Sequence, residues 1–540
     1  MYEKHDTDAT LKDISQEVGL SRDGLSDNCS SGTGEVQVEL KKRFTLWSCL
    51  AMEFASMATW ACLYVTIGIK MQQESNSPTS MRRPRLIAAG QIVGLIYGTI
   101  IVTVLNTLVA MSMGEFASIM PKAGAQQLWT WVAGGEYGPV ISYYTGYLNL
   151  LGEIAMSASC AFNSAQLTGA AIEYTTGVSW TRWMTVLLYW AYLAISLIVN
   201  FYPRYLGSFN IMGFIWLVVT MIVTMIVFLV LGERKQSAEF VFGTFINNTG
   251  WPNGFSYLLG FLPIVYSMTG FDNAAHLAEE LEDPEVNAPR AMVGSVAIGG
   301  VSGLIFSIIM LFTIQDVNGM LAATQPYVKM FIDLFKSTMG GSLFVCIVGV
   351  PINMFAAASI TASSSRLAWA MACDGALPGK DYFSRLSKTR AVPIRTIVLS
   401  GLLQAVLGVI NFGNEMAFEA ILSVAVIALN LSYGMPIYCL WFRGRELLDR
   451  LPLLGTTRGF GVDRRWNLGK WGWAINIVAG VWPALLSVLF LFPVYLPAQG
   501  LVTAEEANWS IAVLGATMII ATVYWFVCGK RQYVGPVTSH

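Results

Sequence analysis

Three carboxylates interrupt long apolar stretches of this 540-residue chain. Glu53, Glu153 and Asp272 each lie in a run whose other residues are mostly apolar. An isolated charge away from water is strongly destabilising, so such a carboxylate takes up a proton, binds a cation or acquires a partner. These positions therefore predict chemistry with protons or small cations.

Two of the apolar runs are interrupted by polar and flexible residues. The first interruption covers residues 53–60, EFASMATW, and the second covers residues 267–273, SMTGFDN. Lipid cannot satisfy an unwound backbone, so a break in a spanning helix is tolerated where it lines a solute site. We therefore predict a site for a small polar solute at the two breaks. Its candidate contacts are Ser56, Thr59, Trp60, Tyr266, Thr269, Gly270, Phe271 and Asp272.

Each of these side chains has a second interpretation. Glu53 either binds a coupling ion or lies in a cytosolic vestibule, and Glu153 either carries a coupling proton or is a neutral packing partner. Asp272 either faces a substrate ammonium or caps the second half of a broken helix. The hydroxyls either bind solute or bond carbonyls of their own or neighbouring helices.

The composition indicates what must position these residues. Hydrophobic residues make up 54% of the chain and charged residues 12%, against about 25% charged in soluble domains. With 33 basic and 34 acidic residues, no basic surplus indicates a nucleic-acid partner. A helix needs about 20 residues to cross the bilayer. Twelve apolar runs suffice, at residues 46–69, 86–112, 137–167, 183–201, 206–232, 255–278, 291–314, 342–371, 394–412, 416–441, 471–495 and 507–528.

The first and sixth runs are broken at matching positions, which indicates how the helices are arranged. A pair of broken helices at corresponding positions is typical of transporters built from inverted repeats. We therefore predict an all-α membrane protein of twelve transmembrane helices, with helices 1 and 6 broken. The expected parts are a disordered cytosolic tail at 1–44, a transporter domain at 45–530 and a cytosolic tail at 531–540. Within the domain, the repeats are 46–232 and 255–441, and helices 11 and 12 lie within 471–528.

Lys and Arg placement predicts the orientation, because cytoplasmic loops retain positive charge. Basic residues gather near residues 41–43, 366–395 and 443–470, which places both termini in the cytosol. Asn247 and Asn508 then begin Asn-x-Ser/Thr sequons in outer loops and are candidate glycosylation sites.

Several function classes are disfavoured. The eight cysteines contain no CxxC pair and there are three histidines, so we expect no metal site, haem or other cofactor. No GxxxxGK phosphate loop is present. No nucleophile and base set stands out, so we do not expect an enzyme.

Three stretches of the sequence form recognisable signatures. They are EFASIMPKAGAQQ at 115–127, TGFD with AEE and NAPRA between 269 and 291, and SRLAWA with DGALP between 365 and 378. Together they resemble signatures of the amino acid/polyamine/organocation (APC) transporter superfamily. Thr59-Trp60, Gln126-Gln127 and the DGALP segment resemble the fungal amino acid/choline permeases most.

The resemblance implies a LeuT-like fold and import of an amino acid, choline or a related amine at the plasma membrane. A cation gradient would drive it, with the proton favoured over sodium. Hydroxyls at Ser359, Thr361, Ser363 and Ser364 resemble in location a sodium site of some relatives. The first break has no glycine, so an amine without a carboxylate stays open. Alternatives are an exporter of a small amine-bearing or specialised metabolite and a non-transporting amino acid sensor.

The acidic loop after the sixth run predicts a cytosolic gate. Glu279 and Glu280 would pair with Arg366 or Lys122 when the inner side closes. The alternative is a solvated loop without lasting partners.

Overall fold

The computed structural model describes residues 44–63, 91–245, 247, 249–323, 325–387, 390, 392–412, 417–450, 466–493, 496 and 508–536. Within these ranges the secondary structure is helical, apart from one isolated β-bridge between Phe44 and Leu281. Residues 1–43 of the predicted tail at 1–44, the first outer loop and the last residues of the chain lie outside the described residues.

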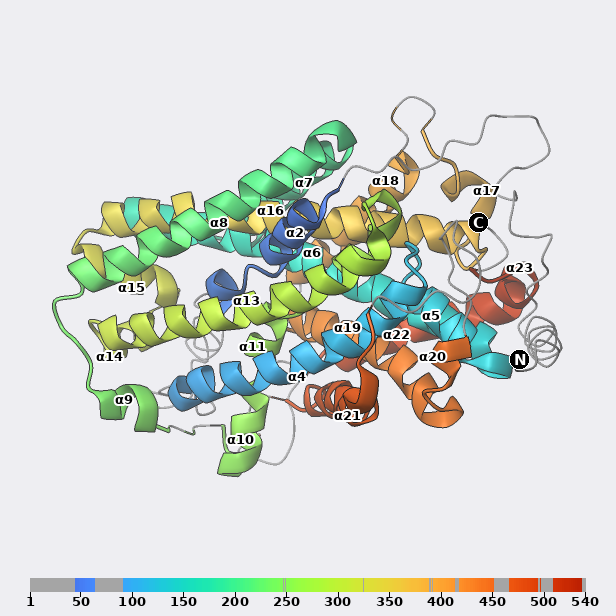
Figure 1. The fold of residues 1–540 in the computed structure, drawn as a ribbon. Helices are drawn as coiled ribbons and strands as arrows, with labels where there is room; N and C mark the ends of the chain where they lie inside the picture. Colours follow the sequence, from blue (N-terminus) through green and yellow to red (C-terminus); the bar gives the residue numbers. More distant parts are fainter. Residues whose placement is uncertain are drawn as a thin grey trace, which may run out of the picture.

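Within each described stretch, the helices follow one another with mostly short connections (Figure 1). The long ones run roughly parallel, and short helices occupy the two ends of the bundle. The α-helices are α2 (Leu46–Met57), α4 (Gln91–Ile119), α5 (Gln126–Ala133), α6 (Gly138–Thr176), α7 (Arg182–Asn200), α8 (Pro203–Leu231), α9 (Ala238–Gly243), α10 (Asn253–Leu259), α11 (Leu262–Ser267), α12 (Asn273–His276), α13 (Pro284–Thr313), α14 (Val317–Ala322), α15 (Pro326–Phe335), α16 (Thr338–Cys373), α17 (Lys380–Phe383), α18 (Ile394–Val409), α19 (Ala417–Arg443), α20 (Leu447–Arg450), α21 (Gly472–Leu489), α22 (Ser510–Tyr524) and α23 (Lys530–Gln532).

Ten helical stretches among the described residues are long and apolar enough to cross a membrane. They correspond to ten of the twelve predicted runs. The third predicted run falls on α6, a helix of 39 residues, and the sixth falls on the short helices α10, α11 and α12. The protein is therefore a multi-pass membrane protein, and the number of twelve spans stays a prediction.

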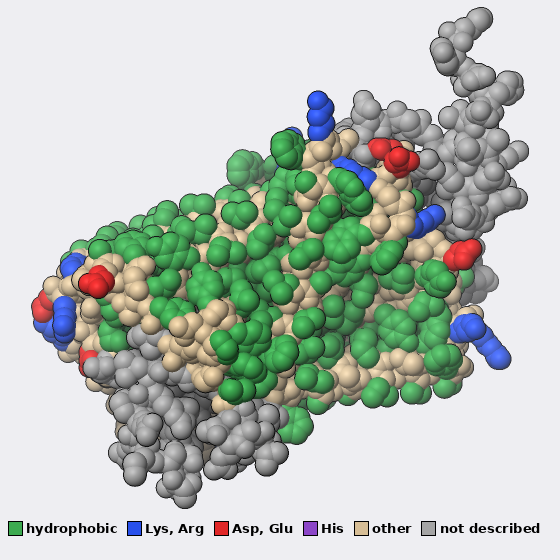
Figure 2. All heavy atoms as spheres, turned by 90° about the horizontal axis from the view of Figure 1, so that it is seen from below, with side chains coloured by type: hydrophobic (Ala, Val, Ile, Leu, Met, Phe, Trp, Pro, Cys, Tyr) green, Lys and Arg blue, Asp and Glu red, His purple; other side chains and the backbone are tan. Residues whose placement is uncertain are grey.

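The surface agrees with a bilayer environment. Figure 2 shows hydrophobic side chains across the middle of one face, while Lys, Arg, Asp and Glu gather towards its two ends. Burial inside the protein falls from 83% of the most apolar window in α19 and 78% in the first span to 22% in α8 and 11% in the last span. Since α8 and α22 bury so little against protein, their apolar faces are left for lipid.

The two broken segments lie among the most buried elements, and each break has a local cause. Ala58 ends α2 in the left-handed conformation, with φ at 42°, and helix resumes at Thr59. Gly270, with φ at 94°, separates α11 from α12 in a conformation that L side chains rarely adopt. The long helices α6 and α16 pack along each other and also contact α19 and α2 respectively. The breaks are therefore held inside the bundle, away from lipid.

Candidate functional site

The first break presents polar groups at the end of α2. The amide of Ala58 donates to the carbonyl of Phe54 at 3.0 Å and closes the helix. The hydroxyl of Ser56 donates to the carbonyl of Glu53 at 2.9 Å, as the helix-internal alternative for this residue anticipated. Ser56, Thr59 and Trp60 are all buried.

The second break is wider. Residues 268–272 are not helical, and the carbonyl of Met268 accepts a hydrogen bond from the amide side chain of Asn106 at 3.2 Å. The hydroxyl of Thr269 donates to the carbonyl of Val265 at 2.7 Å. Asp272 occupies the N-cap position of α12, yet its side chain forms no capping bond. Its carboxylate oxygens instead accept hydrogen bonds from side chains of other helices.

The structure brings the two breaks together. The hydroxyl of Thr59 donates to the carbonyl of Ser267 at 3.0 Å, and the Asn273 side chain donates to the hydroxyl of Ser56 at 3.0 Å. One oxygen of Glu53 accepts from the amide of Ala274, whereas its other oxygen is buried without a hydrogen-bond partner. Segments about 210 residues apart in sequence therefore form one buried polar centre.

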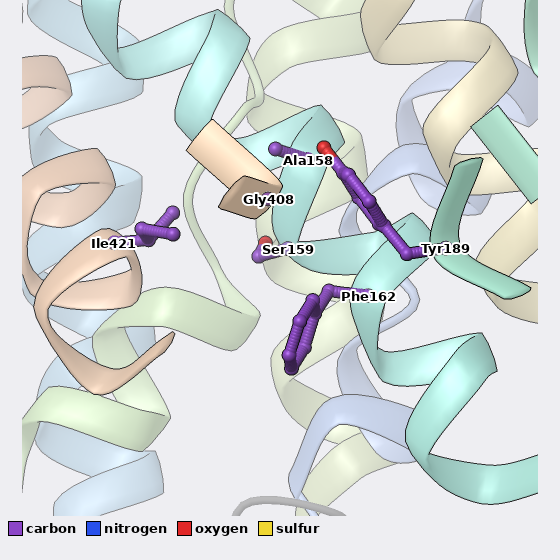
Figure 3. A pocket seen from close by; sticks show the side chains of 6 residues that line it. All are labelled: Ala158, Ser159, Phe162, Tyr189, Gly408 and Ile421. Carbon is purple, nitrogen blue, oxygen red and sulfur yellow. The ribbon is translucent and has the colours of Figure 1, made fainter. Parts of the chain in front are cut away.

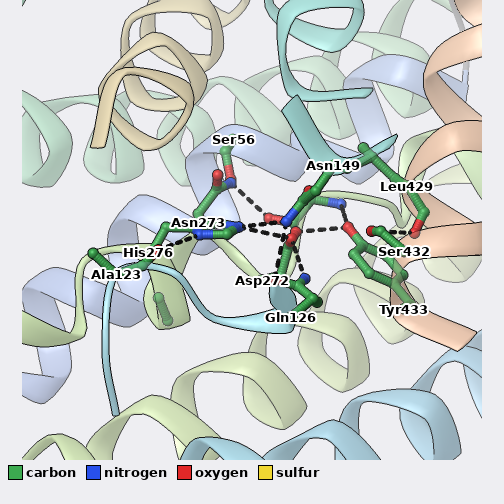
Figure 4. Close-up of polar contacts among 12 residues, drawn as sticks. Ser56, Ala123, Gln126, Asn149, Asp272, Asn273, His276, Leu429, Ser432 and Tyr433 are labelled. Atoms are coloured by element: carbon green, nitrogen blue, oxygen red, sulfur yellow. Dashed lines mark hydrogen bonds and ion pairs between the residues drawn. The ribbon is translucent and has the colours of Figure 1, made fainter. Parts of the chain in front are cut away.

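Asp272 is the hub of that centre (Figure 4). Its Oδ1 accepts from the hydroxyl of Tyr433 at 2.6 Å, and its Oδ2 accepts from the side chain of Gln126 at 2.6 Å. The same Oδ2 lies 3.2 Å from Nε2 of His276. Asn149 connects Gln126 and His276, at 2.9 Å to each. Four elements, α5, α6, α12 and α19, thus meet at one carboxylate.

Glu153 lies beside this hub. Both of its carboxylate oxygens are buried and have no hydrogen-bond partner in the part of the chain that the structure describes. One of them lies within 4.8 Å of a carboxylate oxygen of Asp272 and of a ring nitrogen of His276. Since a bare buried carboxylate is strongly destabilising, this group is suited to take up a proton or face a cation.

The predicted aromatic residues surround the breaks. The ring of Trp60 packs on Phe306 with centroids 4.8 Å apart, and that of Phe271 packs on Tyr433 at 4.8 Å. The hydroxyl of Tyr266 lies 2.6 Å from that of Ser159 on α6. All eight predicted substrate contacts are buried.

A small pocket adjoins the site beside Ser159. Figure 3 shows its lining from α6, α7, the end of α18 and the start of the next span. The pocket has no room for a water molecule, so it does not hold a substrate in this conformation. Its lining residues are Ala158, Ser159, Phe162, Tyr189, Gly408 and Ile421.

The predicted gate residues are in contact. Nε of Arg366 on α16 donates to Glu280 at 3.0 Å, and both side chains are almost fully buried. Glu279 accepts from the backbone amide of Ala123 at 3.2 Å. Phe44, just before α2, exchanges backbone hydrogen bonds with Glu280 and Glu282, at 3.0 and 2.9 Å. This end of the bundle is therefore closed.

The segment after α22 closes the same end further. The hydroxyl of Tyr533 lies 2.6 Å from that of Ser142 and accepts from Gln127 at 3.1 Å, and the amide of Val534 donates to the carbonyl of Asp374 at 3.1 Å. Burial raises the pKa of Tyr533, and nearby Asp374 raises it further. Tyr533 therefore stays protonated where it bridges α5 and α6.

The hydroxyls of α16 mainly serve packing. Ser359 donates to Asn210 on α8 at 3.0 Å, and the hydroxyl of Thr361 lies 2.8 Å from that of Ser157 on α6. Ser364 donates to the carbonyl of Thr361 at 3.2 Å, while the hydroxyl of Ser363 is buried without a hydrogen-bond partner. These contacts match the packing alternative more closely than an open ion site.

The two sequons lie at the opposite end of the bundle. The side-chain nitrogen of Asn247 donates to the carbonyl of Trp251 at 2.7 Å, and that of Asn508 donates to the carbonyl of Phe490 at 2.8 Å. Each of these nitrogens donates two hydrogen bonds, and attachment of a sugar would replace one of its two hydrogens, so one of the two bonds would be lost. Glycosylation of both residues stays a prediction.

Four central residues were not among the predicted contacts: Gln126, Asn149, His276 and Tyr433. Gln126 lies within the family signature at 115–127, and His276 is one of the three histidines that indicate no metal site. The signal that identifies them is polarity inside an apolar run, because amides and imidazoles in spanning helices are costly unless they serve a site.

Comparison with known proteins agrees with this architecture. A family model described as amino acid permease matches residues 44–518. An uncharacterized amino-acid permease of Schizosaccharomyces pombe is 30% identical over 79% of this chain and 77% of its own length. The choline transporter of Saccharomyces cerevisiae is 27% identical over 94% of this chain and 86% of its own length. The amino-acid permease BAT1 of Arabidopsis thaliana is 27% identical over 83% of this chain and 87% of its own length.

Proposed function

The chain belongs to the amino acid permease family, and on that premise we propose that it imports a small amine, an amino acid or choline by alternating access. The transport would be coupled to a cation, with the proton as the favoured ion. The family assignment supports transport of an amine or amino acid, and the buried polar centre supports the finer proposal.

The observation that carries this proposal is the junction of the two breaks. Thr59 bonds the carbonyl of Ser267 across them, and the buried acids Glu53, Glu153 and Asp272 gather around the same centre. Unwound backbone and half-helix ends suit a polar solute at mid-membrane depth. The substrate would lie between the breaks, against Trp60 and Phe271, with walls from α6 and α16.

The charge of this centre favours a cationic solute. Its three acids face one imidazole, and the buried guanidinium of Arg366 is paired with Glu280. An ammonium group gains from nearby carboxylates and from aromatic faces such as Trp60. We therefore propose an amine as the recognised group.

The closed end supports alternating access. The Arg366–Glu280 pair, the Phe44 bridge and the Tyr533 contacts all lie at one end of the bundle. We propose that this end faces the cytosol, that both termini are cytosolic and that the protein resides in the plasma membrane. We further propose that α2–α8 and α10–α19 are the two inverted repeats of a twelve-span LeuT-like fold.

The test is uptake of labelled choline, 4-aminobutyrate and an amino acid panel into yeast lacking its own permeases, with the pH gradient intact and then collapsed. We expect uptake of at least one solute, lost on collapse. Asp272→Asn should raise the apparent Km about tenfold or more for that solute, because a charged hydrogen-bond acceptor is removed. No uptake with protein at the cell surface would instead favour export or sensing.

A further inference from the structure

The hydrogen bonds of His276 indicate which of its two ring nitrogens carries a hydrogen. Its Nδ1 lies 2.9 Å from the carbonyl oxygen of Ala123. A carbonyl only accepts, so Nδ1 carries a hydrogen. In a neutral imidazole, Nε2 is then a bare lone pair.

Two neighbours of Nε2 require opposite protonation states. The amide nitrogen of Asn149, 2.9 Å away, is a donor and suits the lone pair. The Oδ2 of Asp272, 3.2 Å away, is an acceptor and suits an added proton. Without that proton, two lone pairs face each other inside the protein. With it, Asp272 and His276 become an ion pair, and the Asn149 contact is lost.

Glu153 adds a third acceptor beside Nε2 and Asp272. It lies on α6, one helical turn from Asn149, and its two buried oxygens have no hydrogen-bond partner among the described residues. One oxygen is within 4.8 Å of the Asp272 oxygen and the His276 nitrogen. Three proton acceptors therefore lie close together. Asn149 donates to Nε2 and Gln126 donates to Asp272, whereas neither oxygen of Glu153 has a donor among the described residues.

The other groups around His276 do not supply the missing proton. Glu53 on α2 adds a further acid, Gln126 on α5 and Tyr433 on α19 already donate to Asp272, and Arg366 on α16 is paired with Glu280. Ser363 on α16 lies close enough to Glu153 to interact with it.

We propose that Asp272, His276 and Glu153 form the binding site of the coupling proton, with Nε2 of His276 as its carrier. This inference rests on the proposed function and assigns residues to its ion. The proton binds Nε2 and is shared with Asp272. It then moves from Nε2 to a carboxylate oxygen of Glu153, which leaves neutral His276 with its lone pair toward Asn149.

The charges balance through this transfer. Before it, the trio holds two carboxylates and an imidazolium; after it, one carboxylate, one carboxylic acid and a neutral imidazole. The net charge is minus one in both states. The centre therefore still attracts an ammonium while the proton is bound.

The proton also changes which elements are joined. Neutral His276 holds α12 to α6 through Asn149, whereas protonated His276 turns to Asp272 of its own segment. Since α12 is the second half of the broken helix, protonation alters a contact across the site. A ligand that favours one arrangement shifts its population.

A substrate-free experiment tests the assignment. The chain has only three histidines, His5, His276 and His540. In full-length His5→Gln/His540→Gln protein without a histidine tag, ¹³C,¹⁵N-labelled histidine reports His276 alone by NMR. We expect Nδ1 to stay protonated while Nε2 binds a proton with a single midpoint as the pH is lowered. Glu153→Gln should shift that midpoint by about one pH unit or more, as for coupled groups.

The control is Glu173→Gln, on the same helix but far from the centre, which should leave the midpoint in place. The assignment is overturned if Nε2 does not titrate or if Glu153→Gln leaves the midpoint unchanged.

A transport experiment separates this inference from the proposed function. His276→Gln and Glu153→Gln should lower the ratio of concentrative uptake to substrate exchange by about tenfold, equivalent to one pKa unit of coupling. An unchanged ratio with active transport refutes the proton site but not the permease. A wild-type protein that transports no amine refutes the proposed function, and the NMR titration still decides the proton site.

Discussion

Tyr433 shows how one residue organises the centre. Its hydroxyl donates to Asp272 and accepts from the amide of Gly270 at 3.1 Å, while its ring packs on Phe271. The hydroxyl therefore holds both the backbone of the second break and the central carboxylate. No isolated feature of the sequence marks this residue, because it is one of 21 tyrosines in the chain.

Tyr433→Phe should weaken substrate binding with little effect on folding. The ring stays, but Asp272 and Gly270 each lose a partner, at about 1–2 kcal/mol, so the apparent Km should rise about 5- to 30-fold. Concentration-dependent uptake, normalised to surface protein, measures it. Tyr438→Phe is the matched control on the same helix, since its buried hydroxyl makes no hydrogen bond. Equal Km values for the two variants would contradict the prediction.

At the scale of the element, the first break depends on an alanine. Ala58 has φ at 42°, a conformation that costs a residue with a Cβ about 1–2 kcal/mol. Ala58→Gly should therefore leave the protein about 1–2 kcal/mol more stable than Ala55→Gly, which lies inside α2. Both variants lose a buried methyl group, so the difference isolates the backbone.

Thermal unfolding of the two purified variants in detergent checks this prediction. The Ala58→Gly protein should melt at the higher temperature. The same melting temperature in both would mean that the left-handed turn at Ala58 is not strained.

At the closed end, Arg366 on α16 forms an ion pair with Glu280 in the loop that follows α12, and this pair can be tested. Arg366→Gln leaves Glu280 buried without its cation, which costs about 3–5 kcal/mol in the closed state. Transport rate should therefore change at normal surface expression. Glu280→Gln/Arg366→Gln should restore part of it, because no buried charge remains unpaired.

Lys336→Gln is the control for that experiment, because it removes an exposed pair with Glu233 that contributes little. A transport rate in Arg366→Gln equal to that of the wild type would exclude a gating role.

The elements were more predictable than their contacts. Apolar length marked ten spans that the structure contains, and the interruptions at 53–60 and 267–273 marked both breaks. The partners of Asp272 could not be predicted, because Gln126, Asn149 and Tyr433 come from three other elements. Their proximity arises from helix packing, which periodicity does not encode. The acidic loop and Arg366 were paired in advance only because they belonged to recognisable signatures.

For the whole molecule, charge and fold agree on two distinct ends. Segments predicted to be cytosolic, including α17, α20 and α23, lie at one end in Figure 1, and α9, α14 and α15 lie at the other. The sequence placed these loops by counting Lys and Arg, whereas the structure places them by helix packing alone. They agree that these segments share one end, and the prediction from Lys and Arg places that end in the cytosol.

Cysteine labelling tests that orientation. Asp381→Cys lies at the α17 end and Lys336→Cys at the opposite end, both exposed. In intact cells, a membrane-impermeant maleimide should label Lys336→Cys only, and permeabilisation should expose Asp381→Cys. The described native cysteines all lie in or beside spans, and most are buried, so the unmodified protein gives the background. The reverse pattern would invert the protein, place the Arg366–Glu280 contact on the outer side, and make the closed state one that faces the cytosol.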